Sequence, residues 1–87
     1  FVARYGGEEF TMILSGTRID DGRRLVDEMR EGVAGIGFHF RGTPVSITAS
    51  AGITELQQDD AADSVFDRAD KALYQAKQDG RNRCVVI

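Results

Sequence analysis

Two stretches with helical periodicity, set among short β-prone runs, limit the folds open to this 87-residue chain more than any other feature. The first apolar stripe consists of Leu25, Val26, Met29, Val33 and Ile36. The second consists of Val65, Ala69, Ala72, Leu73 and Ala76. Apolar residues at this spacing fall on one face of a helix, and such a face is stable only against another element. We therefore expect two helices that each cover a sheet.

The β-prone runs predict two hairpins and a closing strand. Short β-prone runs on either side of a glycine-containing turn are typical of hairpins. The predicted strands are residues 1–5 and 10–14 around Gly6-Gly7-Glu8-Glu9, residues 38–40 and 45–53 around a turn at 41–44, and residues 82–87. The resulting order, β-β-α-β-β-α-β, predicts an α+β fold with a mainly antiparallel sheet and packed helices.

The ends of both helices carry signals of their own. Thr17 or Asp20 is predicted to cap the first helix, whose acidic first turn suits the helix dipole. Ser64 is predicted to cap the second helix, with Asp67 as the acid of a capping box. Gly80 is the expected end of the second helix.

Composition and charge exclude several classes of function. The formal net charge of −3 argues against binding of a nucleic acid polymer, which requires a basic surface. No apolar run approaches the length of a membrane span, so we expect no direct membrane contact from these residues. Cys84 is the only cysteine, which excludes an internal disulfide and favours a buried, unreactive thiol in a reducing, cytoplasmic setting. Because the first residue is Phe1 and not methionine, we expect the N-terminus to be a cut or a processed end, and a targeting segment, a sensory domain or a membrane attachment could lie upstream.

The loop Gly6-Gly7-Glu8-Glu9 is a candidate binding site. Adjacent glycines allow positive φ angles and close approach of a ligand, and N–H groups at such a turn can face phosphate oxygens. The carboxylates of Glu8 and Glu9 suit Mg²⁺, which proteins usually bind through one or two carboxylates plus substrate phosphates. The same residues also fit a plain hairpin turn with two solvated acids. The loop alone leaves both interpretations open.

Lys77 and Arg81 form a second candidate, four residues apart near the end of the second helix. Such a pair could hold phosphates, but cations in a last turn also simply complement the helix dipole. The remaining polar residues are interpreted as structural: His39 as a strand or surface residue, Asp59 and Asp60 as a solvated loop, and Tyr74 as helix packing.

Three segments, in order, resemble the signature regions of the diguanylate cyclase (GGDEF domain) family. The first is Arg4-Tyr5-Gly6-Gly7-Glu8-Glu9-Phe10, with glutamate in the first acidic position; the others are Val45 to Ile53 and Ala69 to Asn82. The resemblance covers the whole chain but only about the C-terminal half of the family domain. It implies that residues 1–87 are the C-terminal part of a single GGDEF domain with a partial nucleotidyl-cyclase-like fold.

The resemblance implies an enzyme that condenses two GTP into cyclic di-GMP and releases pyrophosphate. Each domain of the family supplies half of the site, so a second GGDEF domain is the implied partner, face to face in a homodimer. Gly6 and Gly7 would lie against the nucleotide. Glu8 would bind Mg²⁺ or Mn²⁺ and act in catalysis, and Glu9 would support the metal. Lys77 and Arg81 would hold the triphosphate.

The family carries further determinants upstream of its signature loop: a metal-binding aspartate, the residues that read guanine, and a product-inhibition motif. Residues 1–87 begin three residues before Arg4 and hold none of these. We therefore expect residues 1–87 to be inactive by themselves. An alternative is a degenerate GGDEF domain that senses nucleotide or contacts a protein partner; the retained loop, Lys77 and Arg81 favour the enzyme.

Overall fold

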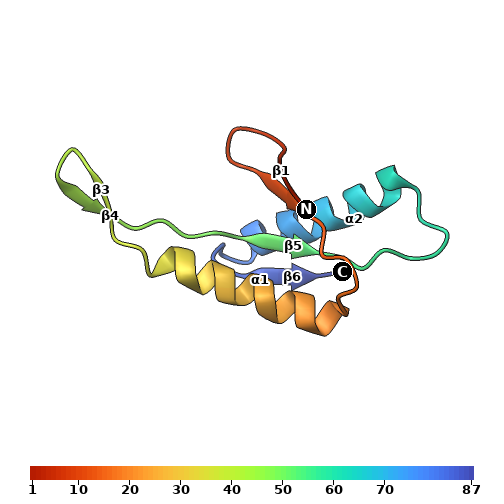
Figure 1. Ribbon diagram of the computed structural model, residues 1–87. Coiled ribbons are helices and arrows are strands. Elements are labelled where there is room, and N and C mark those ends of the chain that lie inside the picture. The colour runs from red at the N-terminus through yellow and green to blue at the C-terminus, as the bar shows by residue number, and fades with distance from the viewer.

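The computed structural model describes residues 1–87 and confirms an α+β fold with two helices (Figure 1). The elements follow in the order β1 (Val2–Arg4), β2 (Phe10–Met12), α1 (Ile19–Ala34), β3 (Phe38–Phe40), β4 (Thr43–Val45), β5 (Ala51–Ile53), α2 (Ala62–Gln78) and β6 (Cys84–Val86). Neither helix is long and apolar enough to cross a membrane.

The strands form three separate pairs. β1–β2 and β3–β4 are antiparallel hairpins, as predicted, while β5 and β6 pair in parallel with Ala51 opposite Cys84 and Ile53 opposite Val86. The parallel pair lies between the two helices, and the β3–β4 hairpin projects from one end of the body (Figure 1). The pair that both helices cover is thus the one pair that is not antiparallel.

The core sits where α2 packs on β5 and β6. Ala72 and Ala76 of α2 have no exposed surface, and their small side chains let the helix approach the strands closely. A Cβ atom on Gly52 of β5 would lie 2.2 Å from the backbone nitrogen of Leu73 and 2.3 Å from the carbonyl oxygen of Ala69. Glycine is therefore required at this crossing, because the helix backbone occupies the space of a side chain. The predicted inward stripe of α2 is confirmed.

The predicted stripe of α1 is partly wrong. Leu25, Met29 and Ile36 are 43%, 47% and 52% exposed. The side of α1 that faces the body carries Gly22, Val26, Asp27, Arg30 and Val33. The inward face of α1 thus includes Asp27 and Arg30, and Arg30 bonds to Asn82 just before β6, a polar contact that an apolar pattern does not detect.

The predicted strand at residues 45–53 is divided in two. Thr43–Val45 pairs with β3 in the projecting hairpin, whereas Ala51–Ile53 pairs with β6 in the body. The residues between them run from one strand pair to the other and pair with no strand. The turn predicted at 41–44 is shorter than expected: Phe40 pairs with Thr43, and only Arg41 and Gly42 form it, both with positive φ (52° and 80°). Two positive φ angles match the tight hairpin turn that strand twist favours.

The predicted N-caps are also wrong. The N-cap of α1 is Arg18, without a side-chain bond, and neither Thr17 nor Asp20 caps it. The N-cap of α2 is Ala61. Ser64 lies inside the first turn, where its hydroxyl accepts the N–H of Ala61 at 3.0 Å and donates to its carbonyl at 2.9 Å. A serine at the third position of a helix can therefore hydrogen-bond to the backbone of the N-cap residue, as well as cap the helix from the N-cap position itself.

Asp60 is not the solvated residue that the sequence suggested. Its side chain is 10% exposed and accepts two hydrogen bonds from Arg68 of α2, at 3.0 and 2.7 Å, and one from the N–H of Gln57 at 2.7 Å. Arg68 also donates to the Thr54 hydroxyl at 2.6 Å and to the Glu55 carbonyl at 2.8 Å. The pair therefore ties the loop before α2 to the helix. Tyr74, interpreted as helix packing, is instead 65% exposed.

The Asp60–Arg68 pair predicts an acid-sensitive contribution to stability. The bonds from Arg68 and Gln57 lower the pKa of Asp60 from 3.8 to about 2. A depressed folded-state pKa stabilises the fold above the unfolded pKa and loses that effect as the pH falls from about 4 towards 2. We expect Asp60→Asn to lower the urea midpoint at pH 7 and this difference to shrink as the pH approaches 2. The matched control is Asp59→Asn, on the exposed neighbour; a pH-independent difference for Asp60→Asn would contradict the prediction.

Candidate functional site

The loop between β1 and β2 is closed by its own hydrogen bonds. The N–H groups of Tyr5 and Gly6 both donate to the carbonyl of Glu9, at 2.8 and 3.3 Å. The guanidinium of Arg4 donates to the carbonyls of Gly6 and Gly7, at 3.1 and 2.9 Å. Sequence reasoning assigned Arg4 no role. In the structure it holds the loop in shape.

The two glycines serve the loop differently from what was expected. Neither Gly6 nor Gly7 has a positive φ. A Cβ on Gly7 would meet nothing within 4 Å, and one on Gly6 would meet only Glu9 Oε2 at 3.9 Å. The glycines therefore leave open space in front of the loop, which a ligand could approach, and the turn does not depend on left-handed backbone.

Helix α2 supports the loop at two points. The ring of Tyr5 lies 4.8 Å from that of Phe66 in the first half of α2. The carboxylate of Glu9 lies 3.9 Å from Nζ of Lys77, in the last turn. Eleven residues of helix separate these points, a length of about 16 Å. The first and third sequence motifs, far apart along the chain, thus meet in space.

The two acids of the loop differ in their surroundings. Glu8 is exposed and forms no hydrogen bond or ion pair, while Glu9 is half-buried beside Lys77. An ion pair this exposed contributes little to stability. No group of three or more His, Cys, Asp or Glu side chains could hold a metal ion among themselves. Glu8 and Glu9 are neighbours in sequence, and proteins usually bind Mg²⁺ through one or two carboxylates plus substrate phosphates.

Arg81 does not continue the helix that carries Lys77. Helix α2 ends at Gln78, and the N–H of Arg81 donates to the carbonyl of Ala76 at 2.9 Å, while the N–H of Gly80 reaches Lys77 at 3.4 Å. This pattern is a Schellman motif, and it confirms Gly80 as the end of the helix. Arg81 therefore lies in a left-handed turn past the helix (φ 64°), and its guanidinium forms no hydrogen bond or ion pair.

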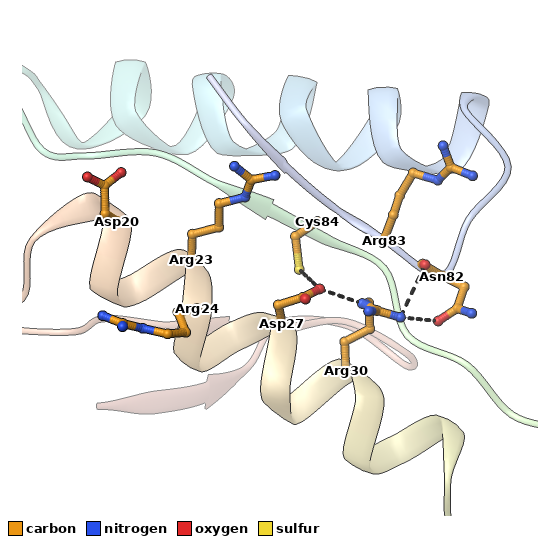
Figure 2. A pocket seen from close by; sticks show the side chains of 8 residues that line it. All are labelled: Asp20, Arg23, Arg24, Asp27, Arg30, Asn82, Arg83 and Cys84. Carbon is orange, nitrogen blue, oxygen red and sulfur yellow. Dashed lines mark hydrogen bonds and ion pairs between the residues drawn. The ribbon is translucent and has the colours of Figure 1, made fainter.

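A polar cavity of about 550 Å³ lies between α1 and β6, and Figure 2 shows the side chains that line it. Arg30 donates to Asp27 at 2.7 Å and to the side-chain oxygen of Asn82 at 2.8 Å, and the Cys84 thiol contacts Asp27 at 3.7 Å. Desolvation and then the charge of Asp27 raise the pKa of Cys84, as expected for an unreactive thiol. His39 is exposed on the projecting hairpin, away from both sites.

Comparison with known proteins gives consistent matches over the whole chain. The family described as diguanylate cyclase, GGDEF domain, matches residues 1–83. Diguanylate cyclase DgcP of Pseudomonas aeruginosa is 50% identical over 86 residues, which cover 99% of this chain and 13% of that protein.

Solved structures agree in fold. The GGDEF domain of DgcB from Caulobacter crescentus, in complex with c-di-GMP, superposes with a TM-score of 0.94 at 37% identity, covering 99% of this chain and 52% of that one. The active GGEEF domain of a diguanylate cyclase from Vibrio cholerae gives a TM-score of 0.85 at 33% identity, covering 99% of this chain and 55% of that one. Residues 1–87 therefore span about half of these domain structures and a small part of the curated relative.

Proposed function

Because the chain belongs to the diguanylate cyclase, GGDEF domain, family, we propose that the protein condenses two molecules of GTP into cyclic di-GMP with release of pyrophosphate. The observation that carries the proposal is the convergence of the Gly6–Glu9 loop with Lys77 across 3.9 Å. This convergence puts carboxylates, an uncovered backbone and a cation in one place, and such groups supply the positioning and charge neutralisation on which attack of a hydroxyl at a nucleotide phosphate depends. The relative with a GGEEF loop is described as active, which supports glutamate in the first acidic position.

Each site residue has a proposed role that follows from its surroundings. The open space at Gly6 and Gly7 admits the nucleotide phosphates against the backbone. Lys77 and the unpaired guanidinium of Arg81 would neutralise the triphosphate. Because Glu8 has no protein partner, its carboxylate is free to bind a cation and to accept a proton from an attacking hydroxyl.

We propose Mg²⁺, or Mn²⁺, as the cofactor. Glu8 and Glu9 would hold it together with substrate phosphates, and the ion would supply charge neutralisation at the phosphate. Since residues 1–87 offer two carboxylates here and no larger cluster, we propose that they do not complete the catalytic site by themselves. Formation of cyclic di-GMP by the isolated 87 residues would contradict this.

A second GGDEF domain is the proposed partner. The product joins two nucleotides, and the Gly6–Glu9 loop and Lys77 of this chain form one side of a phosphate-binding site. A homodimer that brings the loops of its two protomers face to face would bind one GTP to each protomer. Because GTP is the proposed substrate, we place the reaction in the cytoplasm.

Substitution of Lys77 tests the proposal. We expect Lys77→Ala in the full-length protein to raise the KM for GTP roughly tenfold, because a cation facing the triphosphate is lost. The measurement is the initial rate of cyclic di-GMP formation over a range of GTP concentrations. The control is Lys71→Ala, since Lys71 is an exposed cation on the same helix without an ion pair. An unchanged KM would remove Lys77 from the site, and GTP binding without any product would favour the degenerate, nucleotide-sensing alternative.

A further inference from the structure

The turn that carries Arg81 has an unusual backbone. Gly80, Arg81 and Asn82 are three successive residues with positive φ, at 119°, 64° and 49°. Left-handed backbone is unfavourable for residues with a side chain and persists only where the surroundings hold it. The helix supplies bonds only as far as the N–H of Arg81. The next residue, Asn82, must therefore be held from elsewhere.

Asn82 is held by residues from two other parts of the chain. Its N–H donates to the Ser50 hydroxyl at 3.0 Å. Its backbone and side-chain carbonyls both accept from Nη1 of Arg30, at 3.3 and 2.8 Å. Every polar group of Asn82 except the side-chain NH₂ thus has a partner, and both contacts to its carbonyl oxygens come from a single guanidinium.

Arg30 is itself fixed in place. It is 15% exposed, and its Nε donates to Asp27 at 2.7 Å. Figure 2 shows Arg30 extending from α1 to Asn82, which follows the turn at the end of α2. A half-buried guanidinium that donates to three acceptors, and whose Nη2 lies 3.5 Å from the Glu31 carboxylate, is restrained by several contacts at once. Helix α1 therefore contributes, together with Ser50, to holding a turn at the far end of α2, 52 residues away in sequence from Arg30.

We propose that Arg30 is a positioning residue for substrate binding: through Asn82 it holds the left-handed turn that presents the guanidinium of Arg81 to a nucleoside triphosphate. The proposal rests on the proposed function, since it assumes that Arg81 binds phosphate. Arg30 touches no substrate. Without it, Asn82 loses both bonds to its carbonyl oxygens, the turn samples other conformations, and Arg81 pays a larger ordering cost when GTP binds.

A double-mutant cycle in the full-length protein tests this. GTP affinity is measured for the wild type, Arg81→Ala, Arg30→Gln and the double variant, with KM and kcat determined on the same samples. We expect Arg81→Ala to weaken GTP binding roughly tenfold and Arg30→Gln about three- to fivefold, each mainly in KM. In the double variant, the Arg30→Gln substitution should not weaken GTP binding further, because Arg81, the residue that Arg30 positions, is already absent. The control is Arg24→Gln, since Arg24 is an exposed arginine of α1 that pairs only with Asp21.

Each outcome decides the question. If Arg81→Ala binds GTP normally, the phosphate role of Arg81 fails and the inference fails with it. If Arg81→Ala is impaired but Arg30→Gln is not, or if the two effects multiply, the proposed function stands and the positioning role is overturned. Should Arg30→Gln not fold, Asn82→Gly replaces it in the cycle, because glycine permits the left-handed backbone and removes the side-chain amide whose carbonyl oxygen Arg30 binds.

Discussion

Replacement of Glu8 by glutamine is expected to abolish cyclic di-GMP synthesis by the full-length protein, with a loss of roughly a hundredfold or more. Glutamine has almost the same shape but no negative charge, so it can neither balance a divalent cation nor accept a proton. Because the side chain of Glu8 is exposed and forms no hydrogen bond or ion pair with the rest of the chain, the substitution removes no contact that stabilises the fold. The thermal midpoint should therefore stay unchanged while turnover disappears.

The reaction is run with saturating GTP and Mg²⁺. The measurement is the amount of cyclic di-GMP formed, determined by chromatography. Glu28→Gln serves as the control, because Glu28 is likewise exposed but lies on α1. Near-normal turnover of Glu8→Gln would exclude Glu8 from catalysis. Loss of turnover with an equal loss of thermal stability would instead show that the loop depends on Glu8 for its structure, which its lack of contacts argues against.

Substitution of Gly52 by alanine is expected to cause the largest loss of stability, about 3 kcal/mol or more. The new methyl group would lie 2.2 Å from the Leu73 nitrogen and 2.3 Å from the Ala69 carbonyl oxygen. Both are helix backbone atoms, so no side chain can rotate away, and β5 must separate from α2 to make room. The two fully buried alanines of the core belong to this same helix.

Urea unfolding of the purified protein measures the effect. The control is Gly32→Ala in α1, where a Cβ meets nothing within 4 Å. Alanine favours helix over glycine, so this variant should be unchanged or more stable by up to about 1 kcal/mol. A Gly52→Ala protein with a wild-type urea midpoint would mean that the close crossing of β5 and α2 is absent in solution.

Local signals in the sequence predicted most elements. The glycine-containing turns placed both hairpins, and Gly80 ended α2, because turn and cap preferences act over a few neighbouring residues. The stripe of α2 was predicted correctly since all of it is apolar. The inward face of α1 was not, because Arg30 faces the body through hydrogen bonds to Asn82, a residue that no local pattern connects to it.

The candidate site shows the same division. The Gly6–Glu9 loop and Lys77 were identified from motifs, and the structure brings them together. The left-handed turn at Arg81 and the bonds of Arg4 were missed, since both depend on which carbonyl oxygens the fold leaves within reach. The parallel pairing of β5 with β6 was also missed, because it depends on α2 crossing between two strands that are distant in sequence.

Helix α2 has contacts of two kinds, and they make ligand binding and folding thermodynamically linked. Ala72 and Ala76 face the core, while Phe66 and Lys77 contact the loop. A ligand held between the loop and Lys77 therefore binds only to a chain whose α2 is docked on β5. Such a ligand stabilises the native state by mass action, by about 2.7 kcal/mol at a concentration 100 times its Kd. Under the proposed function, GTP would then act on this protein as a folding effector as well as a substrate.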